Sequence, residues 1–264
     1  MGSLVAALGS FLDARSHEGE WYLRIDDIDP PRHDKASFGS IPRCLESHGL
    51  TWDGPIIFQS QRREAHEDTL SKLRNGGHVF DCLCTRATLG ELGACVMDCR
   101  DRKDIEGSVR FHVPTVAPGR IKDLFLGEQH RSALPSNFIV KRRDGLIAYQ
   151  LATAIDDLDE GYTHVIRGAD LLESSLRQMM LHQTLGRLSP DYGHLPIVTD
   201  QSGNKLSKQT GARAIDTDTP NANLRRALAF LGQPTPPQDV DCVEDILQLA
   251  TVNWRRNALN SKNL

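Results

Sequence analysis

Apolar residues recur at two different spacings along the chain, which predicts both helices and strands. Helical spacing, with apolar residues three and four positions apart, covers the first residues, 36–49, 62–76, 171–185, the stretch between proline breaks after 216, and 242–259. Strand-like runs lie at 20–29, 109–113, 121–125, 137–142 and 163–168. Because strands alternate with helices, this order predicts an α/β fold with a mostly parallel sheet.

The first helix carries Leu4, Leu8 and Leu12 on one face, as expected of a helix that packs on a core. A secretion signal is not predicted, because the stretch lacks a basic start and Asp13 and Arg15 close its apolar run. No window approaches the ~18 apolar residues needed to span a bilayer. We therefore expect a cytoplasmic protein that has no membrane partner.

Length and composition indicate one α/β domain with a small appendage. The chain has 264 residues, with 39% hydrophobic and 25% charged residues, which is typical of globular proteins and excludes extended disorder. Lys and Arg number 31 against 35 Asp and Glu, so the net charge is −4. This balance gives no sign of nucleic-acid binding, and any RNA contact must come from a local basic patch.

Four cysteines are grouped in two close pairs, as in many zinc sites. The pairs are Cys82 with Cys84 and Cys95 with Cys99. Two such pairs on short loops can place four thiolates tetrahedrally around zinc, and a closed shell of four sulfurs leaves no position for a catalytic water. The spacing predicts a structural zinc ion; four unrelated buried thiols are the alternative.

Three separated motifs carry residues suited to nucleotide and amino-acid chemistry. GSLVAALGSFL opens the chain as a helix start and is followed by RIDDID and PPR. AYQLATAIDD at 148–157 leads into THVIRGADLL at 163–172. The third motif is the loop GNKLSKQ at 203–209. Each motif alone is a weak signal.

In this order, the motifs resemble the glutamyl-tRNA synthetase branch of class I aminoacyl-tRNA synthetases, and within it the shortened paralogues called glutamyl-Q tRNA(Asp) synthetases. The resemblance covers almost the whole chain. It implies a Rossmann-like catalytic domain with a small zinc-binding insertion and a short helical C-terminal appendage. The expected parts are the first half of the catalytic domain at 1–81, the insertion and connective region at 82–135, the second half with the KLSKQ loop at 136–215, and the appendage at 216–264.

By this resemblance, KLSKQ corresponds to the KMSKS loop, and Gly2 and Ser3 to the end of the HIGH motif. Lys208 and Lys205 are then expected to neutralise charge on the phosphates of ATP, which binds with Mg²⁺. Gly2 and Ser3 would bind phosphate through free backbone N–H groups at a helix N-terminus. The alternatives are a solvated surface loop and an ordinary capped helix.

The resemblance also implies residues for the amino acid. Arg167 can hold a carboxylate through two hydrogen bonds, and an ion pair with Asp170 is its alternative role. Asp26 is expected to receive the substrate ammonium group, although relatives often carry Glu there. Tyr149 offers a hydroxyl at the pocket edge, and a buried structural tyrosine is the alternative.

Relatives begin with a further strand and a histidine just before the Gly-Ser pair, so we expect the first strand of the domain to be missing here because the start was assigned too late. The implied activity is activation of L-glutamate with ATP and transfer to the queuosine base at the wobble position of tRNA(Asp), by a monomer. Two alternatives stay open: a fragment that charges tRNA(Glu), and an inactive zinc-stabilised pseudo-enzyme.

Overall fold

The structure of the protein is a computed structural model that describes residues 1–29, 35–85, 87–90, 94–102, 105–114, 120–130, 136–199 and 215–259. The α-helices are α1 (Gly2–Ser16), α2 (Lys35–Ser47), α3 (Arg63–Asn75), α4 (Tyr149–Asp159), α5 (Leu172–Thr184), α6 (Pro220–Phe230) and α7 (Val243–Val252). All were predicted from helical spacing except α4, whose segment was recognised only as a motif. Among the described residues, no helix combines the length and hydropathy that crossing a bilayer requires.

The strands form several small sheets. They are β1 (Arg24–Ile25), β2 (Ile57–Phe58), β3 (Val79–Cys82), β4 (Ser108–Phe111), β5 (Arg120–Asp123), β6 (Gly127–His130), β7 (Phe138–Lys141), β8 (His164–Gly168) and β9 (Asp191–Leu195). β1 pairs with β2 and β8 pairs with β9, both in parallel. The order β3-β4-β7 and the hairpin β5-β6 are antiparallel.

The α/β class is therefore confirmed, but the prediction of one mostly parallel sheet is wrong for the described residues. Antiparallel pairing needs only a tight turn, and the β5–β6 hairpin makes one with Gly127 at a φ of 68°. The strand predicted over 20–29 is only Arg24–Ile25, because its described ladder with β2 joins just two residue pairs.

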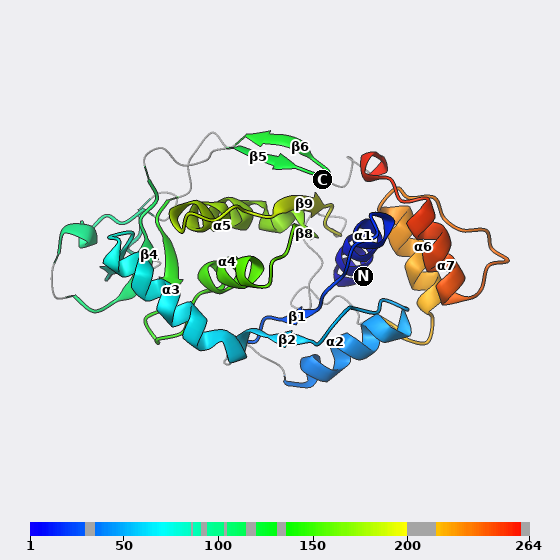
Figure 1. The fold of residues 1–264 in the computed structure, drawn as a ribbon, viewed down its shortest axis with the longest axis horizontal. Coiled ribbons are helices and arrows are strands. Elements are labelled where there is room, and N and C mark those ends of the chain that lie inside the picture. Colours follow the sequence, from blue (N-terminus) through cyan, green and yellow to red (C-terminus); the bar gives the residue numbers. More distant parts are fainter. Residues whose placement is uncertain are drawn as a thin grey trace.

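The largest hydrophobic cluster joins the two ends of the described chain. Leu4, Leu8 and Leu12 of α1 pack with Leu224 of α6 and Ile246 of α7, and all five side chains are buried. In Figure 1, α1 accordingly lies between β8 and the α6–α7 pair. The predicted buried face of the first helix is confirmed.

Close packing brings α1 against β9, where Gly9 faces Leu195. A Cβ at Gly9 would lie 2.5 Å from Cδ1 of the buried Leu195, so a larger residue would collide with that side chain. A second cluster fills the space between α3, α4, α5 and the β3-β4-β7 sheet, with Phe111, Leu151 and Leu181 fully buried in it. These two cores hold the N-terminus of α1 beside the end of β8.

Candidate functional site

A cavity of about 370 Å³ lies between the first turn of α1 and the end of β8. Gly2 and Ser3 line it from the helix, and Arg167 and Gly168 line it from the strand. The structure thus brings together the residues predicted for ATP and one residue predicted for the amino acid. They come from segments far apart in the sequence, and the packing of α1 on β8 joins them.

The N-terminus of α1 is suited to an anion. Its N-cap residue, Met1, makes no side-chain capping hydrogen bond, and the first turn carries no acidic residue. The first backbone N–H groups of a helix have no partner within the helix, and the helix dipole favours negative charge there. This end of α1 can accept a phosphate at the wall of the cavity.

Arg167 is almost completely buried, at 8% exposure, on β8. Its Nη2 donates to Ser175 Oγ at 2.6 Å and to Gln178 Oε1 at 2.7 Å. Its Nη1 reaches the hydroxyl of Tyr149 at 3.4 Å, so the two residues predicted for the amino acid lie together. The guanidinium also lies 5.1 Å from the ring centre of Tyr192.

Several polar atoms close to Arg167 are buried without a protein partner among the described residues. Arg167 Nε, Gln178 Nε2 and the Tyr192 hydroxyl are such atoms. Buried donors of this kind are expensive to leave unpaired. Of these three atoms, only Arg167 Nε belongs to a residue that lines the cavity.

Asp26 follows β1 and has a different environment from Arg167. It accepts a hydrogen bond from Arg24 Nε at 2.8 Å, and its side chain is 37% exposed. Arg24 also donates from Nη1 to Asp157 Oδ1 at 2.6 Å. Asp26 does not line the 370 Å³ cavity within the described chain, so its predicted contact with the substrate ammonium stays a prediction.

Sequence reasoning missed Ser175 and Gln178, which hold Arg167. Both are fully buried on α5, three residues apart, on a helix whose other buried positions are largely apolar. Polar residues at this spacing on a buried helix face need a polar partner. That spacing is a signal in the sequence that would have led to them.

The predicted loop residues Lys205 and Lys208 lie outside the described residues. Their roles therefore stay predictions from the sequence. Of the predicted catalytic and binding residues, the structure describes Gly2, Ser3 and Arg167 in one cavity, with Tyr149 beside them.

The four cysteines of the zinc motif form one cluster. The Sγ atoms of Cys82, Cys84, Cys95 and Cys99 all lie within 4.8 Å of one another. Cys95 Sγ is 3.8 Å from Cys82 Sγ and 3.6 Å from Cys84 Sγ. Sulfurs bound tetrahedrally to zinc at about 2.3 Å lie about 3.8 Å apart, so the donor set fits this metal.

The environments of these thiols differ. Burial raises the pKa of Cys82 to about 12. Burial also acts to raise the pKa of Cys95, but hydrogen bonds from the backbone N–H groups of Cys99 and Met97 outweigh it and hold that pKa at about 7. The cluster is a candidate metal centre formed by the last residue of β3 and the segment that leads to β4.

The comparison with known proteins decides the family. Over residues 1–234, the sequence matches the family described as tRNA synthetases class I (E and Q), catalytic domain. The chain belongs to this family. It is therefore a ligase of the aminoacyl-tRNA synthetase type, and the predicted resemblance is confirmed at this level.

Curated members of the family are similar over nearly the whole chain. The glutamyl-Q tRNA(Asp) synthetase of Yersinia pseudotuberculosis serotype I (strain IP32953) is 43% identical over 259 residues, which cover 96% of this chain and 78% of the relative. The enzyme of the same name from Escherichia coli (strain K12) is 42% identical over 270 residues, covering 98% of this chain and 85% of the relative.

The family fold is also found among solved structures. A glutamate tRNA ligase from Elizabethkingia meningosepticum CCUG26117, in complex with its amino acid, superposes with a TM-score of 0.75 at 22% identity. The match covers 98% of this chain and 62% of that chain, so this chain spans less than two thirds of its length. The likeness establishes the synthetase fold.

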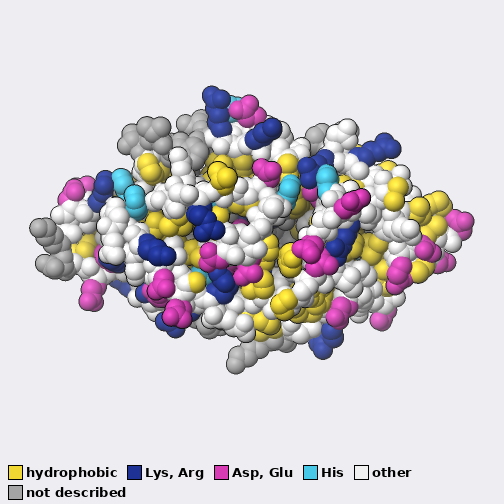
Figure 2. Space-filling view, viewed as in Figure 1, with side chains coloured by type: hydrophobic (Ala, Val, Ile, Leu, Met, Phe, Trp, Pro, Cys, Tyr) yellow, Lys and Arg dark blue, Asp and Glu magenta, His cyan; other side chains and the backbone are white. Residues whose placement is uncertain are grey.

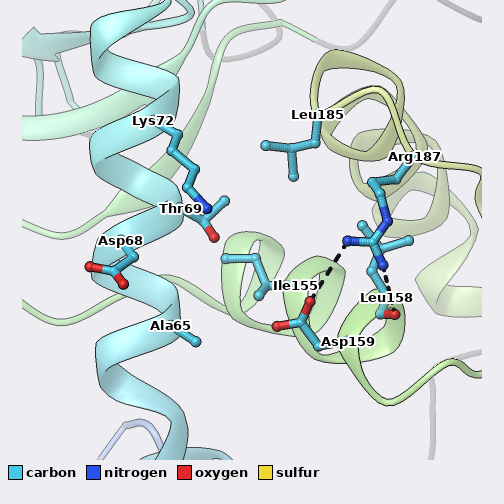
Figure 3. A pocket seen from close by; sticks show the side chains of 9 residues that line it. All are labelled: Ala65, Asp68, Thr69, Lys72, Ile155, Leu158, Asp159, Leu185 and Arg187. Atoms are coloured by element: carbon cyan, nitrogen blue, oxygen red, sulfur yellow. Dashed lines mark hydrogen bonds and ion pairs between the residues drawn. The ribbon is translucent and has the colours of Figure 1, made fainter.

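A separate cavity of about 290 Å³ between α3 and α4 carries no predicted synthetase residue (Figure 3). Ile155 and Leu185 give it apolar walls, and Lys72 points toward it from α3. Arg187 on its rim contacts Asp159 at 3.9 Å and donates to the Leu158 carbonyl at 3.1 Å. Arg187 and Asp159, two of its charged residues, are thus paired with each other.

Proposed function

We propose that the protein activates L-glutamate with ATP and transfers it to the queuosine base at the wobble position of tRNA(Asp). The observation that carries this proposal is the cavity in which Gly2 and Ser3 meet Arg167. The name shared by relatives at 39–43% identity supports the choice of glutamate, queuosine and tRNA(Asp). ATP and tRNA are both available in the cytoplasm, where we expect the protein to act.

The first step joins glutamate to AMP. A carboxylate oxygen of glutamate bonds to the α-phosphorus of ATP, the bond from this phosphorus to the β-phosphate oxygen breaks, and pyrophosphate leaves. The N–H groups of Gly2 and Ser3 bind phosphate oxygens. Lys208 and Lys205 neutralise the negative charge that develops there, and Mg²⁺ accompanies the nucleotide.

The amino acid is held beside the nucleotide. Arg167 and Tyr149 bind a carboxylate of glutamate, because a buried guanidinium with a nearby hydroxyl is well suited to that group. Asp26 receives the ammonium group. In the second step the glutamyl group passes from the adenylate to queuosine, and AMP leaves.

The remaining parts of the chain have supporting roles in this proposal. Residues 1–81 and 136–215 form a Rossmann-like catalytic domain, 82–135 the insertion and connective region, and 216–264 the appendage. Zinc on the four cysteines cross-links the insertion, where the described cluster around the sulfurs has just Phe80, Cys82 and Cys99 as buried members. The working unit is a monomer.

Transfer of radiolabelled glutamate separates the alternatives. We expect label on tRNA(Asp) that carries queuosine and none on tRNA(Asp) that lacks it. Label on tRNA(Glu) alone would identify a tRNA(Glu)-charging enzyme. Metal-loaded, folded protein that activates no amino acid would identify a pseudo-enzyme.

A further inference from the structure

Arg167 is the end of a chain of buried hydrogen bonds that begins in the β5–β6 hairpin. Arg167 Nη2 donates to Ser175 Oγ, which lies 2.7 Å from His194 Nε2. His194 Nδ1 in turn lies 2.5 Å from Asp123 Oδ2. The four side chains come from β8, α5, β9 and β5, so the chain links four elements.

The chemistry of the groups fixes the direction of the hydrogen bond at each end of this network. The Asp123 carboxylate can only accept, so Nδ1 of His194 carries its hydrogen and donates to it. We assign the tautomer with its hydrogen on Nδ1, in which Nε2 has a lone pair and accepts from the Ser175 hydroxyl; that hydroxyl also lies 3.3 Å from the Leu171 carbonyl. The remaining lone pairs of Ser175 Oγ accept from Arg167, whose guanidinium can only donate.

Backbone N–H groups hold Asp123, at the other end of this hydrogen-bond network. Asp123 Oδ1 accepts from the N–H groups of Phe125 and Leu126, each at 2.9 Å, and from that of His194 at 3.2 Å. Burial acts to raise the pKa of Asp123, but the bonds from His194 and these N–H groups outweigh it and lower that pKa. The carboxylate therefore stays ionised and fixes the tautomer of His194.

Burial makes the arrangement rigid. The side chains of His194 and Asp123 are completely inaccessible to solvent. Ser175 and Gln178, the two residues that accept from Arg167 Nη2, are also fully buried. Breaking one of the hydrogen bonds that join Arg167, Ser175, His194 and Asp123 would leave a buried polar atom without its partner, which is costly.

A second buried histidine–aspartate pair has no hydrogen bond that leads to Arg167. His66 Nε2 lies 2.8 Å from Asp156 Oδ1, and both residues are fully buried. Asp156 also accepts from Gln59 and Arg62. This pair joins α3 to α4, and none of its hydrogen bonds reaches Arg167, so it is a matched structural control.

We propose that Asp123, His194 and Ser175 are positioning residues that orient the Arg167 guanidinium toward the amino-acid carboxylate. The proposal rests on the proposed function, in which Arg167 binds glutamate. It gives the β5–β6 hairpin, which lies outside the predicted catalytic halves, a direct part in binding the amino acid. Neither the glutamate nor the nucleotide needs to touch Asp123 or His194.

Two substitutions of His194 separate positioning from general stability. H194N keeps a donor for Asp123 at the place of Nδ1 but leaves nothing to accept from Ser175. H194Q keeps an acceptor at the place of Nε2. The assay is glutamate-dependent exchange of pyrophosphate into ATP. In it, we expect H194N to raise KM for glutamate about tenfold and to leave KM for ATP unchanged. H194Q should recover most of that loss, and H66N should leave KM for glutamate at the wild-type value.

A second readout does not depend on activity. The guanidinium resonances of Arg167, assigned by their loss in R167K, should show slow rotation in the wild type and faster rotation in H194N and S175A. Equal rotation in all three proteins overturns the proposal, as does an equal rise of both KM values in H194N and H194Q. If the wild type exchanges pyrophosphate with no amino acid, the proposed function fails, and the rotation rates still decide whether the network holds Arg167.

Discussion

Asp13, near the end of α1, accepts a hydrogen bond at 2.9 Å from the indole of Trp254, a residue 241 positions later in the chain. Arg256 binds both oxygens of the same carboxylate, each at 2.8 Å. Asp13 is only 3% exposed. The last described residues are thus anchored to the first helix, whose other end lines the candidate active site.

Removing this anchor should destabilise the protein. We expect D13A to lower the free energy of unfolding by about 3 kcal/mol, because it leaves a buried indole N–H and a partly buried guanidinium without their acceptor. R256M removes the cation from the same buried carboxylate and leaves it with the Trp254 N–H, so it should also lower the free energy of unfolding, by about 2–3 kcal/mol. Urea unfolding measures both, and a loss below 1 kcal/mol for D13A contradicts this assignment.

The binding of glutamate should depend on the guanidinium of Arg167. R167K keeps the positive charge but loses the planar fork that binds a carboxylate through two bonds. We expect KM for glutamate in pyrophosphate exchange to rise about 10- to 100-fold, while KM for ATP stays near the wild-type value. R187K, at the exposed arginine of the other cavity, is the control. An unchanged KM for glutamate in R167K would remove Arg167 from the site.

Lys208 should act on the chemical step. K208A is expected to lower kcat for pyrophosphate exchange by about 100- to 1,000-fold, since the transition state loses a cation beside the phosphates. K72A is a matched control, because Lys72 is an exposed lysine at the cavity between α3 and α4. If both variants lose the same activity, the KLSKQ loop has no special role.

The cysteine cluster should bind one equivalent of zinc. Metal analysis of the purified wild type is expected to give equimolar zinc, and C84S should lose most of it and melt at a lower temperature. C242S, at an exposed cysteine away from the cluster, should keep both the metal and the melting temperature. Equal zinc content in wild type and C84S would contradict the site.

His182 should make the stability fall in mild acid. Burial lowers the pKa of His182 from 6.5 to about 4 in the folded protein. Between these two values the unfolded state binds a proton that the folded state does not, so stability rises with pH through this window and is lost as the pH falls. The contribution lost by pH 4.5 is roughly 2–3 kcal/mol.

The matched variant is H182Q, which can still donate to the Ala154 carbonyl that His182 Nε2 contacts at 3.0 Å. Urea unfolding from pH 7 to pH 4.5 should show a smaller loss of stability in H182Q than in the wild type. Parallel curves would show that His182 is not the group that titrates.

Local patterns in the sequence predicted much of the fold. Helix α5 was predicted at 171–185 and spans Leu172–Thr184, because its apolar spacing reports directly on its buried face. The cysteine cluster was also predictable, since close pairs on short loops bring their sulfurs together. Strand β1 was predicted too long, because its length depends on partner strands that the local sequence does not encode.

Long-range contacts could not be predicted in the same way. The bond between Asp123 and His194 joins residues 71 positions apart, and no local period connects β5 with β9. The surface charge does not help to locate the site, because acidic and basic side chains are interspersed over the face shown in Figure 2. The site residues were predicted from motif order, whereas the contacts of Ser175 and Asp123 with His194 follow only from the folded structure.

Glutamate-dependent exchange of pyrophosphate into ATP is the most direct test of the central claim, that the cavity beside α1 activates an amino acid. The protein should catalyse this exchange with L-glutamate, and neither L-aspartate nor L-glutamine should support it at the same concentration. Folded, metal-loaded protein that exchanges pyrophosphate with no amino acid would contradict the account.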